Sequence, residues 1–194
     1  MADSYKLRPW TFIPSWLSTI DSQLWQNRIY ENLRWQRPLV KVYGSSYVVP
    51  RKIAFLAEKN ICYKYSGLVH YGIGWPDWFS PLLEKVAHAC NTNFNGCLIN
   101  LYRNGNDRMG MHADDEIEID STKPIASLSF GAARDFIFKH RNGNIREVLS
   151  LKDGDLLIMH PTCQESWLHS VPIRKNIINA RINLTFRSYI KPGK

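Results

Sequence analysis

The sequence lacks the features that define several classes of protein. Its cysteines form no C-x-x-C pair, which argues against a disulfide scaffold or a zinc knuckle and favours buried, reduced thiols. No apolar run approaches the roughly 20 residues that span a bilayer, and the N-terminal "MADSYKLRPW" has no apolar core of a secretory signal. No internal repeat, low-complexity segment or linker interrupts the chain. These absences predict one soluble intracellular domain without membrane contact, cytoplasmic in a bacterium and nuclear in a eukaryote. The cysteines are Cys62, Cys90, Cys97 and Cys163.

Acidic residues are scarce at both ends of the chain. The formal net charge is +8, only three acids occur in residues 1–52, and nothing acidic follows Glu165. An uneven basic field of this kind favours polyanions as partners. Ordinary solubility charge explains the same bias equally well, so nucleic-acid binding is a hypothesis that needs a site.

Hydrophobic periodicity predicts helices followed by a β-rich half. Near-helical spacing of Leu17, Ile20 and Leu24 predicts one amphipathic helix after Pro14, and a Ser-Pro start at Ser80 predicts a second. The later part of the chain consists of short alternating or apolar runs: "CLINLY", "IASLSF", "DFIFKH", "REVLSL", "DLLIMH" and "RINLTFR". We expect a β-sandwich or barrel that the helices cover within the same domain. Between the two halves, "VYGSSYVVPRK" (residues 42–52) is predicted to form a surface hairpin.

One stretch, "DRMGMHADDEIEID", gathers six carboxylates and a histidine in residues 107–120. In an extended backbone, His112 and Asp114 point to the same side. Two imidazoles and one carboxylate on one face make an open non-haem iron(II) site. The candidates for the remaining imidazole are His140, His160 and His169. We favour His169, which precedes an extended apolar segment, while an acid-rich surface loop is the alternative interpretation.

Two predicted strands carry polar side chains on one face. In "RINLTFR", the polar residues alternate with Ile182, Leu184 and Phe186, which we expect to face the core. The polar face either is solvated at a sheet edge or lies inside a barrel, where its arginines require an anionic partner such as a small dicarboxylate. Asn100 and Tyr102 share a face of "INLYRNG" in the same way, and an amide and a phenol can donate hydrogen bonds to a carboxylate.

Together, "NLY", "HADDE", "HS" and "RINLTFR" resemble, in order and combination, the AlkB family of iron(II)- and 2-oxoglutarate-dependent dioxygenases. The resemblance extends from about Val42 to Arg187 and is closest to the branch that repairs duplex DNA. It implies a single domain, residues 1–194, of mainly β (α+β) class. Flanking helices and a nucleotide-recognition lid are expected over about residues 1–95, and a jelly-roll (double-stranded β-helix) core over about 96–190. Residues 163–167, "CQESW", match no pattern of the family.

The resemblance also implies roles for individual positions. The expected iron ligands are His112, Asp114 and His169. The residues expected to hold 2-oxoglutarate are Asn100, Tyr102, Arg181, Asn183, Thr185 and Arg187, with Arg187 on the distal carboxylate and Arg181 at the border of the pocket. The positions expected beside the target base are Asp115 and Glu116, and those expected in the lid are Tyr63, Tyr65 and Ser66. The hairpin whose tip fills the gap left by an extruded base is expected to hold Tyr43, Gly44 and Ser45, and Arg51 is expected to contact nucleic acid.

The activity implied by the resemblance is oxidative demethylation of bases in DNA. A monomer using Fe(II), 2-oxoglutarate and dioxygen would act on 1-methyladenine- and 3-methylcytosine-type bases in double- or single-stranded DNA, and would release formaldehyde and succinate. Two alternatives stay open. One is a 2-oxoglutarate oxygenase that acts on RNA, protein or a small molecule. The other is a non-catalytic jelly roll that binds a metal such as zinc at the same three ligands.

Overall fold

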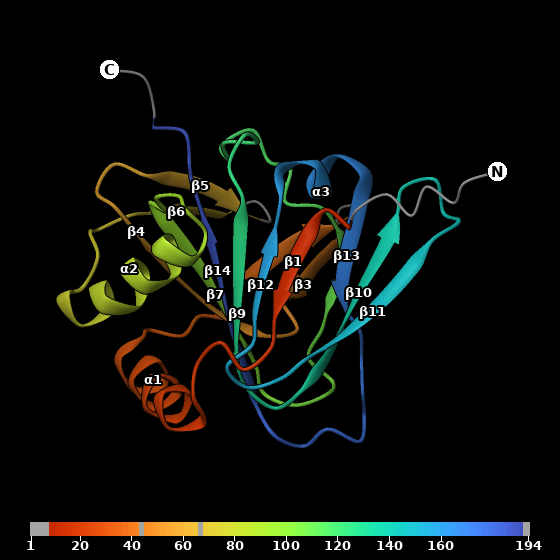
Figure 1. Ribbon diagram of the computed structural model, residues 1–194, viewed down its shortest axis with the longest axis horizontal. Helices are drawn as coiled ribbons and strands as arrows, with labels where there is room; N and C mark the ends of the chain where they lie inside the picture. The colour runs from red at the N-terminus through yellow and green to blue at the C-terminus, as the bar shows by residue number, and fades with distance from the viewer. Residues whose placement is uncertain (1–7, 43–44, 66–67, 192–194) are drawn as a thin grey trace.

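The computed structural model describes residues 8–42, 45–65 and 68–191, and it contains two antiparallel β-sheets that face each other (Figure 1). The larger sheet has the order β1 (Trp10–Ile13), β12 (Leu156–Met159), β9 (Ile125–Gly131), β14 (Arg181–Arg187), β7 (Gly96–Tyr102) and β4 (Lys52–Ala57). The smaller sheet has the order β11 (Arg146–Leu151), β10 (Arg134–His140), β13 (Trp167–Val171) and β8 (Met109–His112). This architecture confirms the predicted mainly β, jelly-roll core.

Short helices and two hairpins complete the described chain. The helices are α1 (Thr19–Asn32), a 3-10 turn η1 (Asp77–Phe79), α2 (Ser80–Ala89) and α3 (Pro161–Ser166). The hairpins are β2 (Leu39–Val42) with β3 (Ser45–Val48), and β5 (Cys62–Tyr65) with β6 (Leu68–Tyr71). Of the helices in the described residues, none is both long and apolar enough to cross a bilayer.

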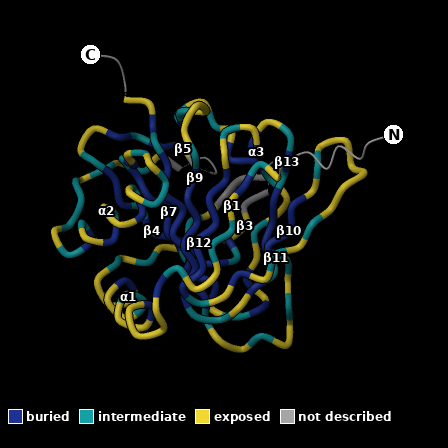
Figure 2. Tube along the Cα trace, in the orientation of Figure 1, coloured by how far each residue is buried: buried dark blue, intermediate teal, exposed yellow. Residues whose placement is uncertain are grey.

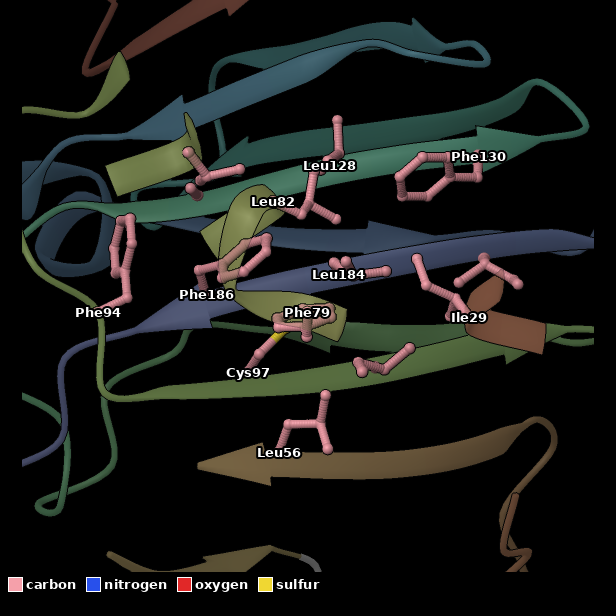
Figure 3. Packing of buried hydrophobic residues seen from close by; sticks show 14 of the residues in the cluster. Ile29, Leu56, Phe79, Leu82, Phe94, Cys97, Leu128, Phe130, Leu184 and Phe186 are labelled. Atoms are coloured by element: carbon pink, nitrogen blue, oxygen red, sulfur yellow. The ribbon is translucent and has the colours of Figure 1, made fainter. Parts of the chain in front are cut away.

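The outer face of the larger sheet is covered by α1 and α2. Phe79 and Leu82 lie against Leu184 and Phe186 of β14, and Ile29 of α1 closes the same cluster (Figure 3). As a consequence, the central strands are buried, while both helices expose their outer sides (Figure 2). Burial of apolar side chains on this scale, at about 25 cal/mol per Å², is what holds the helices to the sheet.

The inner face of the larger sheet packs on the smaller sheet, and this layer contains the polar residues. Trp10 of β1 stacks on Phe138 of β10 at 3.9 Å between ring centroids, which joins the two sheets. All seven residues of β14 are buried, and the strand lies between β9 and β7. Because Ile182, Leu184 and Phe186 face the helices, the alternate polar residues face the space between the sheets. The interpretation of "RINLTFR" as a solvated edge strand is therefore wrong.

Several elements differ from the prediction. The larger sheet includes β1 and β4, which lie in about residues 1–95, where helices, a surface hairpin and a lid were expected. The helix after Pro14 begins at Thr19, where the Ser18 side chain accepts a hydrogen bond from the Asp21 amide at 3.1 Å. The prediction that this helix buries an apolar face with Ile20 and Leu24 is wrong, because these side chains are 73% and 64% exposed. Of the four thiols, Cys97 and Cys163 are buried, whereas Cys62 and Cys90 are only partly so.

Candidate metal and anion site

Three side chains with metal-binding atoms converge between the sheets. One ligand atom from each of His112, Asp114 and His169 lies within 4.8 Å of the others. The Nε2 atom of His112 is 3.6 Å from Oδ1 of Asp114, and the two imidazole rings are 4.2 Å apart between centroids. Two imidazoles and one carboxylate that converge in this way are the donor set of non-haem iron(II) sites.

Strand pairing brings these ligands together. His112, the last residue of β8, pairs directly with His169 in the middle of β13, so the two imidazoles leave the same face of the smaller sheet. Asp114 follows two residues later, where the chain has left the strand. The Nδ1–H group of His112 donates to the carbonyl of Gly110 at 2.9 Å. The other ring nitrogen, Nε2, therefore points towards Asp114 and is free of a proton for metal binding.

The electrostatics of this cluster suit a divalent metal ion. Burial lowers the pKa of His169 to about 3, so its ring is neutral, as metal binding requires. Burial alone raises the pKa of Asp114, but Arg187 and the two histidines outweigh this effect and bring the pKa below its usual range. Oδ2 of Asp114 and Nδ1 of His169 are buried without a hydrogen-bond partner. Since buried polar atoms rarely stay unsatisfied, this donor set fits iron(II).

Arg187 holds the carboxylate of Asp114. Its Nη2 donates to Oδ1 at 2.7 Å, and the two side chains are 4% and 3% exposed. Burial lowers the pKa of Arg187, but Asp114 and the nearby tyrosines raise it well above its ordinary value, so the guanidinium is charged. The structure differs here from the expectation that Arg187 binds the distal carboxylate of 2-oxoglutarate, because this guanidinium is engaged by a residue of the metal cluster.

Arg181, at the other end of β14, has a guanidinium that is only partly bonded. Its Nη2 donates to Oγ of Ser129 at 2.9 Å and to Oδ1 of Asn183 at 2.7 Å, while Nε and Nη1 have no partner. The residue is 1% exposed, and burial lowers its pKa to about 10 despite the opposing effect of Tyr102. A buried guanidinium with unbonded N–H groups calls for an anion.

One inner cavity joins Arg181 to the metal cluster. The Tyr102 ring is close to two guanidinium groups, those of Arg181 and Arg134, each 5.4 Å from the ring centroid. Asn183 is oriented by Ser127, which donates to its Oδ1 at 2.9 Å. The predicted residues that line this cavity, besides the three of the metal cluster, are Asn100, Tyr102, Arg181, Asn183, Thr185 and Arg187. The structure thus brings together every position that was expected to hold iron or 2-oxoglutarate.

Arg51 does not lie at the surface. It is 3% exposed, and its Nε donates to Oδ1 of Asn100 at 2.6 Å. Its Nη1 also contacts the carbonyl of Arg108 at 3.4 Å. This placement differs from the expected contact with nucleic acid, because the guanidinium is used to orient a side chain of the inner cavity.

A second, acidic cavity of about 160 Å³ lies beyond Asp114. Asp115 is exposed there, and its Oδ2 is 2.8 Å from Nη2 of Arg141. The Tyr63 hydroxyl donates to Oε1 of Glu116 at 2.8 Å, while Oε2 is buried without a partner. Burial raises the pKa of Glu116, although Arg187 opposes the shift. Among the described residues that line the two cavities, Asp114 is the one that they share.

The other predicted positions are placed as follows. His160 is exposed and contacts Thr11 through Nε2 at 2.9 Å, and His140 packs on Trp167, so neither joins the metal cluster. Tyr63 is completely buried in β5. The remaining lid and hairpin positions are not described by the structure. Tyr43, Gly44 and Ser66 lie outside the described residues, and so do the side chains of Ser45 in β3 and Tyr65 in β5.

Sequence analysis missed residues that support the cavities. Ser127 and Ser129 were part of "IASLSF", and their alternation with apolar residues was a signal that they face inward. Gln164 accepts a hydrogen bond from the backbone amide of Asp114 at 2.9 Å. No pattern in the sequence indicated this contact, because it joins residues 50 positions apart through a short helix.

Comparison with known proteins decides the family. Residues 9–187 match the model of a protein family described as the 2OG-Fe(II) oxygenase superfamily. DNA oxidative demethylase ALKBH2 from Mus musculus is 39% identical over 163 residues, which cover 80% of this chain and 68% of that protein. The chain belongs to this superfamily and, within it, to the AlkB family.

Other AlkB relatives agree. ALKBH2 from Homo sapiens is 38% identical over 163 residues, covering 80% of this chain and 62% of that protein. The alpha-ketoglutarate-dependent dioxygenase alkB homolog 3 from Homo sapiens is 35% identical over 153 residues, covering 74% of this chain and 53% of that protein. The matched region is therefore between 53% and 68% of the length of these three relatives.

A solved structure supports the fold. The structure of OsALKBH1 aligns with a TM-score of 0.68 at 19% identity, covering 95% of this chain and all of that one. Membership of the AlkB family confirms the predicted enzyme class, an iron(II)- and 2-oxoglutarate-dependent dioxygenase that uses dioxygen. The cluster of His112, Asp114 and His169 fits that chemistry.

Proposed function

We propose that this chain removes methyl groups from ring nitrogens of DNA bases by oxidation. Its substrates are bases of the 1-methyladenine and 3-methylcytosine type, and its products are the restored base, formaldehyde, succinate and carbon dioxide. The observation that carries this proposal is Asp114, which lines both the inner cavity with its arginines and the outer, acidic cavity. The names of the Mus musculus and Homo sapiens relatives, DNA oxidative demethylase ALKBH2, support the same reaction.

In this proposal, His112, Asp114 and His169 bind iron(II). When bound, the metal with 2-oxoglutarate and dioxygen supplies the oxidation of the methyl C–H bond. The ion pair with Arg187 keeps Asp114 ionised and in one orientation. Phe136 stacks on His169 with ring centroids 5.1 Å apart, which restricts the imidazole and keeps water from that side.

Arg181 binds the distal carboxylate of 2-oxoglutarate. The two N–H groups that lack partners are suited to a charge-assisted, bidentate contact, and Tyr102 beside them adds a phenol. Asn183 and Thr185 are joined by a hydrogen bond of 3.0 Å and complete the polar wall. The co-substrate therefore spans from the metal cluster to Arg181, in the cavity that Asn100 and Arg187 also line.

The acidic cavity receives the methylated base. Methylation at adenine N1 or cytosine N3 makes the base cationic, and nearby carboxylates favour that form over a neutral base. Asp115 and Glu116 supply these charges. The lid residues Tyr63 and Tyr65, with Ser66, serve nucleotide recognition in this proposal, and the buried Tyr63 does so through its hydroxyl, which donates to Glu116. A base inside a duplex must first be extruded at a cost of a few kcal/mol, which is smaller when methylation already prevents pairing.

Asp115→Asn is expected to lower kcat/KM for 1-methyladenine in DNA by about tenfold, which corresponds to about 1.4 kcal/mol. The variant removes a negative charge from the base cavity. Stability is expected to change by less than about 1 kcal/mol, because the lost pair with Arg141 is solvent-exposed. The measurement is restored base per unit time, with Glu118→Gln as control, because Glu118 is half-buried and does not line this cavity. Equal activity of Asp115→Asn and the unmutated chain would remove Asp115 from the base site.

Tyr43→Ala is expected to reduce repair of duplex DNA by about tenfold or more and repair of single strands by less than about threefold, because lost stacking costs about 1–3 kcal/mol. The reason is that Tyr43, with Gly44 and with Ser45 at the start of β3, is proposed to fill the gap left by an extruded base. Tyr47→Ala in the same hairpin, which removes an exposed ring of β3, is the control. Equal losses on both substrates would reject a wedge at Tyr43.

A single panel tests the proposed function against its alternatives. Methylated adenine and cytosine are presented in single-stranded DNA, duplex DNA and RNA, and formaldehyde and restored base are scored. We expect a monomer that acts on both forms of DNA, with affinity that falls steeply as salt rises, because the chain carries a net charge of +8. Turnover confined to RNA, protein or a small molecule would support the first alternative. No succinate formation with iron, ascorbate and 2-oxoglutarate would support a non-catalytic metal-binding jelly roll.

A further inference from the structure

We propose that Gln164 is a positioning residue that holds the metal ligand Asp114 in place; this inference rests on the metal site of the proposed function. Asp114 lies beyond the end of β8, in a segment that no strand pairing supports. Its side chain is nevertheless buried, and its backbone amide therefore needs an acceptor inside the protein. The Oε1 atom of Gln164 provides that acceptor at 2.9 Å.

Gln164 is itself held from three directions. It lies on α3 with 9% of its surface exposed, and its Nε2 donates to Sδ of Met159 at 3.5 Å. Its backbone carbonyl accepts a hydrogen bond from Nη2 of Arg141 at 3.1 Å. The same Nη2 binds Asp115 at 2.8 Å, and the Arg141 amide donates to the Ser166 carbonyl at 2.8 Å. Rotation of the Gln164 side chain would break its contacts with Asp114 and Met159, and the bonds from Arg141 hold the backbone of α3 that carries it.

These contacts form a closed path between the two cavities. The path runs from Asp114 to Gln164, from Gln164 to Arg141, and from Arg141 to Asp115, the residue next to Asp114 in the chain. Both ends of the dipeptide Asp114–Asp115 are thus fixed, one on the metal side and one on the base side. A metal ligand outside regular secondary structure acquires in this way the rigidity that strands give to His112 and His169.

The chemistry of an amide suits this position. An uncharged oxygen accepts the N–H of Asp114 without placing a second charge beside a carboxylate that must bind a cation. Residues that orient metal ligands typically change metal affinity by about 10- to 100-fold when they are replaced. Gln164 belongs to "CQESW", the segment that matched no pattern of the AlkB family.

The test measures the binding of Co(II) to the metal-free full chain and to its variants. Calorimetry gives the affinity, and the visible absorption of the bound ion reports its coordination. Gln164→Met keeps the length of the side chain and removes the acceptor, whereas Gln164→Glu keeps the acceptor oxygen. We expect Gln164→Met to weaken Co(II) binding by about tenfold or more and to alter the absorption spectrum. Gln164→Glu is expected to bind Co(II) with an affinity within about threefold of that of the unmutated chain. The same is expected of the control Glu165→Met, because the Glu165 side chain is exposed on the same helix.

Each outcome has one meaning. The positioning role is overturned if Gln164→Met binds Co(II) within about threefold of the unmutated chain, even if its melting temperature falls. It is also overturned if Gln164→Glu loses as much Co(II) affinity as Gln164→Met. Where Gln164→Met does not fold, Gln164→Ala removes the acceptor without adding a side chain to pack, and the same limits apply. If the unmutated chain binds no Co(II), or binds it equally well after His169→Ala, the metal site of the proposed function is what fails.

Discussion

Asp114→Ala and His169→Ala are both expected to abolish turnover of 2-oxoglutarate, but Asp114→Ala is expected to cost far more stability. Each variant removes one of the three proposed metal ligands. Asp114→Ala also leaves the Arg187 guanidinium buried, at 3% exposure, without its carboxylate. Breaking a buried ion pair in this way costs about 3–5 kcal/mol of the free energy of unfolding. His169 has a neutral ring, so its loss removes mainly the packing against Phe136.

Succinate formation and the midpoint of denaturant unfolding measure the two effects separately. His140→Ala and His160→Ala are the matched controls, because these histidines were the other candidates for the third ligand and lie outside the metal cluster. Both controls are expected to retain turnover. Turnover in His169→Ala that equals that of the controls would reject the ligand assignment, and an unchanged stability in Asp114→Ala would reject the buried ion pair.

Arg181→Met is expected to raise the 2-oxoglutarate concentration needed for half-maximal turnover by about 100-fold or more, which corresponds to about 2.7 kcal/mol. Arg181 offers two unbonded N–H groups in the inner cavity, and burial has already lowered its pKa to about 10. Without the co-substrate, the buried charge of Arg181 destabilises the chain. Binding of the dicarboxylate offsets this unfavourable free energy. Replacing that charge with an apolar side chain of similar length is expected to change the free energy of unfolding by less than about 1 kcal/mol.

Arg134→Met supplies the contrast. Arg134 is equally buried and also lies 5.4 Å from the centroid of the Tyr102 ring, but its guanidinium donates to the backbone carbonyls of Asn104, Asp107 and Pro172. Its replacement is expected to destabilise the fold by about 2 kcal/mol or more, since it removes the guanidinium donor from the buried or partly buried carbonyls of Asp107 and Pro172. Steady-state kinetics and thermal unfolding with and without 2-oxoglutarate separate the two arginines. If Arg181→Met is strongly destabilised but reaches half-maximal turnover at the same 2-oxoglutarate concentration, the proposal that Arg181 binds the co-substrate carboxylate is contradicted.

Local patterns in the sequence were enough for the strands and for much of the site. The alternation in "RINLTFR" predicted two faces of opposite chemistry, and the buried β14 has both. The same reasoning failed for α1, where Ile20 and Leu24 are exposed, because helical spacing shows that a face exists but not whether another element covers it. It also failed for β1 and β4, since a strand at the edge of a sheet depends on partners far along the chain.

By itself, the sequence determined which residue types alternate, where turns interrupt them, and that an extended backbone would bring His112 and Asp114 to one side. Only the tertiary structure decided which histidine completes the cluster, because that follows from the pairing of β8 with β13 across 57 residues of chain. It also decided the division between the two arginines of β14. One neutralises Asp114 and the other is left with unbonded N–H groups, since the charge that each meets depends on packing between the sheets and not on its neighbours in sequence.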